Sequence, residues 1–167
     1  AKALEAQGQS IIHLEIGEPD FDTPKNIIEA GVDAMRGGWT HYGPANGQPD
    51  AREVVANYVA KSRGIEVHPD EVTIVPGGKP TMFYAMLALI EKGDEVIYPN
   101  PGFPIYESMI NFSGGKAVAC PIRESNAFAL DPEDVISRLT PRTKMVILNS
   151  PANPTGGVTP KESLEKV

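Results

Sequence analysis

Three short loops in this sequence carry residues suited to holding a small anionic ligand. The first, Pro76-Gly77-Gly78-Lys79, lies between an expected strand and an expected helix. Its small residues would let backbone N–H groups approach an anion at the helix N-terminus. A turn between a strand and a helix also uses glycine for its geometry alone. This loop therefore indicates a site only in combination with others.

The second and third loops add an aromatic ring and an amide. In Asn100-Pro101-Gly102-Phe103-Pro104, the ring of Phe103 lies at the start of the next expected helix, where it would either stack on a planar cofactor or belong to the core. The third loop, 149–156, ends in Asn153-Pro154-Thr155-Gly156 and follows the most apolar expected strand. The Asn153 amide could donate to a phenolate-type oxygen, although the same residues suit an ordinary turn.

Strand and helix patterns alternate along the chain and would place these loops at strand ends. A short strand at 11–14 precedes a helix that starts at Thr23-Pro24 and stops at Gly37-Gly38. The remaining expected strands are 72–75, 95–98, 116–121 and 144–148, and the remaining helices are 50–63, 81–91, 104–112, 132–139 and a last one from Pro160 onward. This alternation predicts an α/β fold in which the last four strands form a mostly parallel sheet flanked by helices. In such sheets, ligands bind beyond the carboxyl ends of the strands.

Composition excludes several kinds of protein. The net charge is −7 with no basic block, which argues against a nucleic-acid surface, and no run approaches the roughly 20 apolar residues of a membrane helix. The first residues do not read as a secretory signal, and the single cysteine, Cys120, permits no internal disulfide, so we expect a cytoplasmic protein. The three histidines lack the spacing of metal ligands, so no metal site is expected.

Taken together, the loops resemble those of fold-type I pyridoxal-phosphate enzymes, in the class I/II or aspartate aminotransferase family. The resemblance runs the length of the chain and includes Gly17-Glu18-Pro19-Asp20-Phe21 and Tyr42-Gly43-Pro44-Ala45-Asn46-Gly47. It identifies the chain as the N-terminal portion of such an enzyme. Residues 1–22 would be an N-terminal segment of the small domain or active-site arm, and residues 23–167 would be part of the cofactor-binding large domain.

The resemblance also implies roles for particular residues around the cofactor, pyridoxal 5′-phosphate. Gly78 and Lys79 match the phosphate-binding turn, in which main-chain N–H groups and the helix terminus hold the phosphate. Phe103 matches the aromatic residue that covers one face of the pyridine ring, a position commonly occupied by Trp or Tyr in the family. Asn153 matches the residue that bonds the ring hydroxyl oxygen.

Two further matches concern the substrate and a second subunit. Gly17 matches a backbone contact near the substrate carboxylate. Tyr42 matches a tyrosine that reaches the phosphate of the neighbouring subunit, which implies a homodimer. The Schiff-base lysine, the aspartate at the pyridinium nitrogen and the arginine for the substrate carboxylate lie further along in the family, and no position here matches them. The chain alone is therefore expected to be inactive and to contain no catalytic residue.

The function implied by the resemblance is transfer of an amino group between an L-amino acid and a 2-oxo acid. A pyridoxal-phosphate lyase acting at the beta carbon has the same cofactor loops, and a nonenzymatic module could retain the fold without turnover. A nucleotide-binding domain is disfavoured, because no Gly-x-Gly-x-x-Gly follows the first strand. In the family, strands from later sequence separate the strand matching 72–75 from the other three. We therefore expect an incomplete folding unit, with 72–75 set apart.

Overall fold

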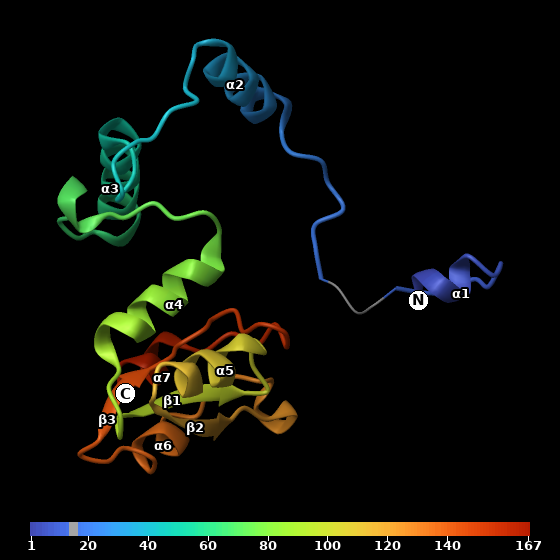
Figure 1. The fold of residues 1–167 in the computed structure, drawn as a ribbon. Coiled ribbons are helices and arrows are strands. Elements are labelled where there is room, and N and C mark those ends of the chain that lie inside the picture. Colours follow the sequence, from blue (N-terminus) through green and yellow to red (C-terminus); the bar gives the residue numbers. More distant parts are fainter. Residues whose placement is uncertain (14–16) are drawn as a thin grey trace. The chain divides into compact units, whose positions relative to one another are not determined.

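The computed structural model describes residues 1–13 and 17–167 and divides them into two compact units, Ala1–Gln48 and Pro49–Val167. Figure 1 shows both units. The predicted boundary between residues 22 and 23 concerns the domains of the family and stays a prediction.

The first unit contains two helices, α1 (Lys2–Glu5) and α2 (Lys25–Arg36). The apolar face of α2 is uncovered in the described residues, since Ile27, Ile28 and Met35 are 56%, 47% and 64% exposed. The predicted strand at 11–14 is wrong for residues 11–13, which form no strand, and Leu14 lies outside the described residues.

The second unit opens with α3 (Pro49–Arg63), the short 3-10 helix η1 (Pro69–Glu71) and α4 (Gly78–Leu89). The buried side chain of Arg52 joins the first two: its Nη1 donates to the Pro69 carbonyl at 2.9 Å and to Asp70 Oδ1 at 3.1 Å. This contact ties the loop after α3 back onto the helix.

Segment 72–75 was predicted to be a strand of the sheet, and this prediction is wrong. Val72 has an extended backbone, with φ −108° and ψ 126°, but no strand forms over 72–75. A run of β-branched residues favours extended backbone, whereas a strand also needs a partner for its N–H and C=O groups. No described strand lies beside this segment, which agrees with its expected separation from the other three.

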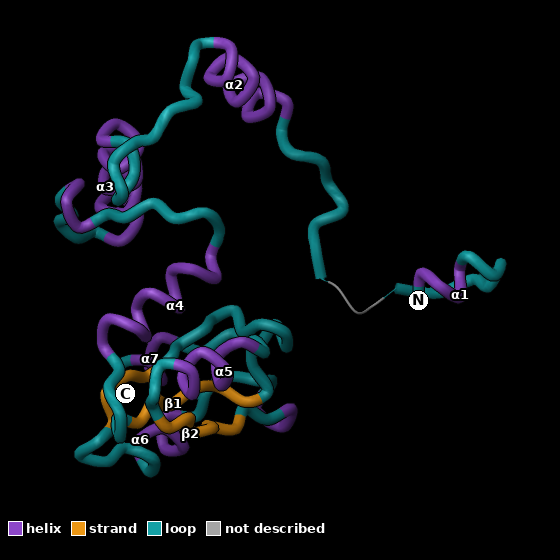
Figure 2. Tube along the Cα trace, in the orientation of Figure 1, coloured by secondary structure: helices purple, strands orange, loops and turns teal. Residues whose placement is uncertain are grey.

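The other three predicted strands form the parallel sheet. They are β1 (Glu95–Asn100), β2 (Lys116–Pro121) and β3 (Thr143–Val146), in the order β2-β1-β3. Figure 2 shows the strands in orange. Around them lie α5 (Ile105–Phe112), η2 (Glu124–Asn126), α6 (Pro132–Ile136) and α7 (Lys161–Leu164). The predicted α/β fold with a parallel sheet flanked by helices is confirmed.

Successive residues of β1 point to two different cores. Val96 and Tyr98 pack with Ile110 of α5 and with residues of α4. Ile97 packs on the opposite face with Val135 of α6. This alternation follows from the two-residue period of a strand. Helices therefore cover both faces of the sheet, as expected.

Neither a membrane span nor a metal cluster is present in the described ranges. No helix in 1–13 or 17–167 is both long and apolar enough to cross a bilayer. No group of three or more His, Cys, Asp or Glu side chains there could hold a metal ion.

Candidate functional site

The carboxyl edge of the sheet brings two of the three predicted loops together. Because β1 and β3 are parallel, loops 100–104 and 149–156 both leave the sheet at this edge. The Ile147 N–H donates to the Ile97 carbonyl at 2.8 Å, which continues the pairing beyond the last residue of β3. Loop 149–156 is thus anchored on the central strand.

The conformation of loop 149–156 is set by Asn149. Its Oδ1 accepts a 2.7 Å hydrogen bond from the Asn153 N–H. The Gly156 N–H donates to the Ala152 carbonyl at 2.7 Å, and the Ala152 N–H donates to the Gly157 carbonyl at 2.8 Å. The Asn153 side chain is exposed on this tightly bonded loop. Sequence reasoning missed Asn149, although an Asn a few residues before the predicted ligand is a known turn-forming signal.

The hydroxyl group of Thr155, in the same loop, is unusual. Its Oγ1 is buried and has no hydrogen-bond partner within the described residues. A buried hydroxyl without a partner costs free energy, so such groups usually have a partner in the working protein. Loop 149–156 therefore has two polar side chains, those of Asn153 and Thr155, that fit a polar ligand or a further part of the protein.

Phe103 lies on the α5 side of the sheet and is half-buried. It packs against the core that contains Tyr98 and Tyr106, and its ring meets Tyr106 edge-on, with centroids 5.9 Å apart and an interplanar angle of 79°. Burial raises the pKa of the Tyr106 and Tyr98 phenols, so both are uncharged at neutral pH. The edge-on contact fixes the plane of the Phe103 ring at the end of β1.

The turn before Phe103 has room only for glycine. A Cβ added to Gly102 would lie 2.2 Å from the Pro99 carbonyl oxygen, which is backbone and cannot easily move. Gly102 therefore lets loop 100–104 fold back closely onto β1, so that the Phe103 ring can pack against Tyr106.

Gly78 and Lys79 begin α4, a helix of 12 residues. Gly77 precedes it with a φ of 89°, in the left-handed region that favours glycine, and no described side chain caps the helix. The first-turn N–H groups are thus left for an anion such as a phosphate. Lys79 also lines a shallow groove with Met109 of α5. The joint placement of Gly78 with Phe103 and Asn153 stays a prediction.

The two remaining predicted residues belong to the first unit. Gly17 and Tyr42 are both exposed, and the Tyr42 side chain is fully so. Their predicted contacts with a substrate carboxylate and with a partner subunit's phosphate stay predictions.

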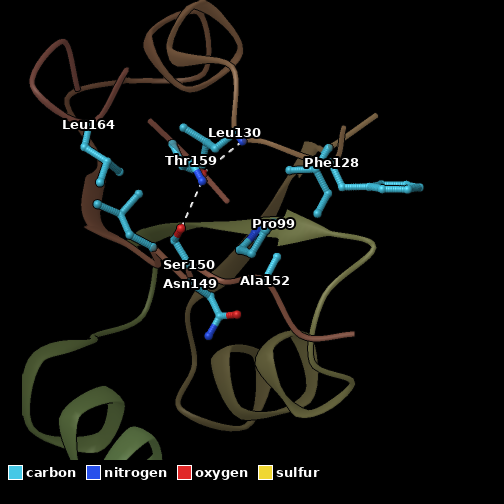
Figure 3. Close-up of a pocket in the computed structure, with 10 residues that line it drawn as sticks. Pro99, Phe128, Leu130, Asn149, Ser150, Ala152, Thr159 and Leu164 are labelled. Atoms are coloured by element: carbon cyan, nitrogen blue, oxygen red, sulfur yellow. Dashed lines mark hydrogen bonds between the residues drawn. The ribbon is translucent and has the colours of Figure 1, made fainter. Parts of the chain in front are cut away.

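A pocket opens at the carboxyl ends of the three strands, on the α6 side of the sheet (Figure 3). Thr159 spans it: the Leu130 N–H donates to Thr159 Oγ1 at 3.1 Å, and the Thr159 N–H donates to Ser150 Oγ at 2.9 Å. The lining residues are Pro99, Ile122, Phe128, Leu130, Leu148, Asn149, Ser150, Ala152, Thr159 and Leu164. None of the predicted cofactor residues lines it, although Asn149, Ser150 and Ala152 of loop 149–156 do.

Comparison with known proteins identifies the family. The sequence model described as "Aminotransferase class I and II" matches residues 9–167. A probable aspartate/prephenate aminotransferase of Aquifex aeolicus is 41% identical over all of this chain, which spans 42% of that relative's length. An aspartate/prephenate aminotransferase of Thermus thermophilus is 43% identical over 99% of the chain and 43% of its own length.

Solved structures agree. Aspartate aminotransferase from Thermus thermophilus with maleate superimposes with a TM-score of 0.95 at 41% identity, over 99% of this chain and 43% of that one. An alanine aminotransferase from Pyrococcus furiosus gives a TM-score of 0.95 at 31% identity over the same shares. Together with the three loops and the parallel sheet, these matches show that the chain belongs to the class I and II aminotransferase family.

Proposed function

We propose that the protein containing this chain is an aminotransferase that uses pyridoxal 5′-phosphate to move an amino group between an L-amino acid and a 2-oxo acid. The observation that carries this proposal is the family match over residues 9–167, in a chain whose Asn153 loop is tightly bonded at the carboxyl edge of a parallel sheet. The whole protein would include the sequence that this chain, at 42% of a relative's length, does not span.

The donor set fits the cofactor. Uncapped N–H groups at the start of α4, with Gly78 and Lys79, would hold the phosphate. The ring of Phe103 would cover the pyridine face, and the exposed Asn153 amide would donate to the ring hydroxyl oxygen. The cofactor, when bound, would stabilise negative charge at the alpha carbon of the amino acid. The residues named here would bind and orient it, while the lysine that moves the proton would come from later sequence.

The same family match also leads to proposals for the substrate and for the oligomeric state. The names of the two bacterial relatives make aspartate the first amino donor to test. Gly17 would contact the substrate carboxylate through its backbone. Tyr42 would reach the phosphate held by a second copy, so we propose a homodimer. Cys120 is a free, buried thiol, which suits the reducing cytoplasm.

The test is an amino-transfer assay on the full-length protein. Aspartate and 2-oxoglutarate with pyridoxal phosphate should yield glutamate and the 2-oxo acid of aspartate in equal amounts. Replacing Asn153→Ala should weaken cofactor binding about tenfold or more, since one hydrogen bond to a charged group contributes about 1.5 kcal/mol or more. A protein that binds no pyridoxal phosphate would contradict the proposal.

Two other functions would show themselves in the same assay. A lyase acting at the beta carbon would release the beta substituent and ammonia and leave a 2-oxo acid as product, without needing a 2-oxo acid as amino acceptor. A nonenzymatic module would bind the cofactor or a partner without turning over either substrate.

A further inference from the structure

One buried carboxylate, that of Glu95, contacts the amino ends of all three strands. Its side chain is 3% exposed. Lys116 Nζ, at the start of β2, donates to Oε1 at 3.0 Å, and Arg142 Nη2 donates to the same oxygen at 2.9 Å. Thr140 Oγ1 donates to Oε2 at 2.7 Å. Both Thr140 and Arg142 lie just before β3, so Glu95 joins β2 and the entry to β3 through its place on β1.

Backbone hydrogen bonds hold the same junction. The Glu95 N–H donates to the Arg142 carbonyl at 2.8 Å, and the Lys116 N–H donates to the Asp94 carbonyl at 2.8 Å. Within the turn, the Arg142 N–H donates to Thr140 Oγ1 at 3.1 Å. The segment that leads into β3 is therefore fixed to β1 before the strand pairing begins.

The register of β3 on β1 changes directly after this junction. Glu95 lies opposite Thr143, but Val96 lies opposite Met145, so Lys144 is an extra residue that forms a bulge. Lys144 itself is exposed.

The bulge decides which way β3 faces. Met145 packs against the core on the α5 side and Val146 against the core on the α6 side. A slip by one residue would move each of these side chains to the other face of the sheet. It would also move loop 149–156 by one residue along the carboxyl edge.

Electrostatics favours the observed register over one in which the whole of β3 is shifted along β1. A buried carboxylate is costly unless hydrogen bonds and opposite charges surround it. Arg142 and Thr140 both reach Glu95 when Thr143 lies opposite it, and a slipped strand would carry them away. We propose that Glu95 is a positioning residue, which holds β3 against a shift along β1 and thereby fixes the place of loop 149–156 for cofactor binding. The last step rests on the proposed function.

Glu95→Gln tests this in the full-length protein, with two measurements. Amide hydrogen exchange reports the register, because the Ile147 N–H bonds to the Ile97 carbonyl only after the bulge. Relative to the central amides of β1, exchange at Ile147 should accelerate at least tenfold. The dissociation constant of pyridoxal phosphate should rise by roughly three- to tenfold, with a changed absorption spectrum of the bound cofactor.

Asp134→Asn is the matched control. Asp134 is also a largely shielded carboxylate, 15% exposed, that bonds two arginines, Arg123 and Arg138, but it lies on α6, and neither arginine belongs to β1 or β3. This variant should lose stability without a selective change at Ile147 or in cofactor affinity.

Deletion of Lys144 is a second variant that removes the bulge while Glu95 stays. Thr143 would still lie opposite Glu95 and Met145 opposite Val96, so exchange at Ile147 and cofactor affinity should both stay close to those of the wild type. The proposal would be overturned if exchange at Ile147 stayed at the wild-type rate in Glu95→Gln. It would also be overturned if exchange at Ile147 accelerated equally in the Asp134→Asn control. Failure of the wild-type protein to bind pyridoxal phosphate would contradict the proposed function, and exchange at Ile147 would still decide the register.

Discussion

Asn149 Oδ1 accepts a 2.7 Å hydrogen bond from the backbone N–H of Asn153, across four residues of the loop after β3. One asparagine thus holds the backbone of the other, whose own side chain is left exposed. Asn149 orients the loop, and the side chain of Asn153 is the proposed contact of the cofactor.

Asn149→Ala should loosen this loop and weaken cofactor binding. Loss of one hydrogen bond costs about 1 kcal/mol, so the dissociation constant of pyridoxal phosphate should rise roughly fivefold in the full-length protein. Exchange of the Asn153 amide should accelerate in parallel. Asn149→Asp keeps an acceptor at Oδ1 and should leave that amide protected. Equal exchange in the alanine variant and the wild type would show that Asn149 does not hold the loop.

Gly102→Ala should disturb the place of Phe103. The new Cβ would lie 2.2 Å from the Pro99 carbonyl oxygen, so backbone must shift, at a cost of about 1–3 kcal/mol. Gly115→Ala is the control, since its Cβ would lie 2.6 Å from the Ile90 side chain, away from the carboxyl edge. Both variants should unfold at lower denaturant concentration. Only Gly102→Ala should also weaken cofactor binding, and equal binding by the two would contradict this role.

Acid should destabilise the sheet through Glu95. The Thr140 hydroxyl, then Lys116, and also Arg142 lower the pKa of this carboxyl from 4.5 to about 2 in the folded state. Because the folded pKa is depressed, the stabilisation is fully present above pH 4.5 and is lost as pH falls toward 2. In denaturant unfolding between these pH values, the free energy of unfolding should fall less steeply with decreasing pH for Glu95→Gln than for the wild type. Glu29→Gln, at an exposed position, is the control. If the slope of unfolding free energy against pH matched the wild type in both variants, the assignment of this acid sensitivity to Glu95 would be refuted.

Local pattern was enough to predict much of this fold. The strand 116–121 was predicted with the bounds that β2 has, because a β-branched and small apolar run lies between Gly115 and the Pro121 strand end. The predicted helix 104–112 starts one residue before α5 (Ile105–Phe112), because Pro104 is the N-cap of that helix. In each case the information lies within a few neighbouring residues.

Contacts between distant residues could not be predicted in this way. Segment 72–75 has the composition of a strand, but pairing depends on residues far along the chain, and no described strand lies beside it. Glu95 bonds residues 21 and 47 positions away, so nothing in its neighbourhood marks it as the junction of three strands. The candidate loops were found because glycine, proline and asparagine mark turns. Asn149, which orients one of them, acts through a bond that only the folded loop reveals.

The isolated 167-residue chain should be protected from hydrogen exchange unevenly. Val96 and Ile97 are at most 1% exposed and lie in the central strand, so their amides should exchange slowest. Amides of α2, which buries no residue, and of 72–75, which lies beside no described strand, should exchange fast. In the full-length protein, 72–75 should become protected, because we expect this segment to pair with strands from later sequence. Strong, uniform protection of the isolated monomer would show that residues 1–167 already form a complete folding unit.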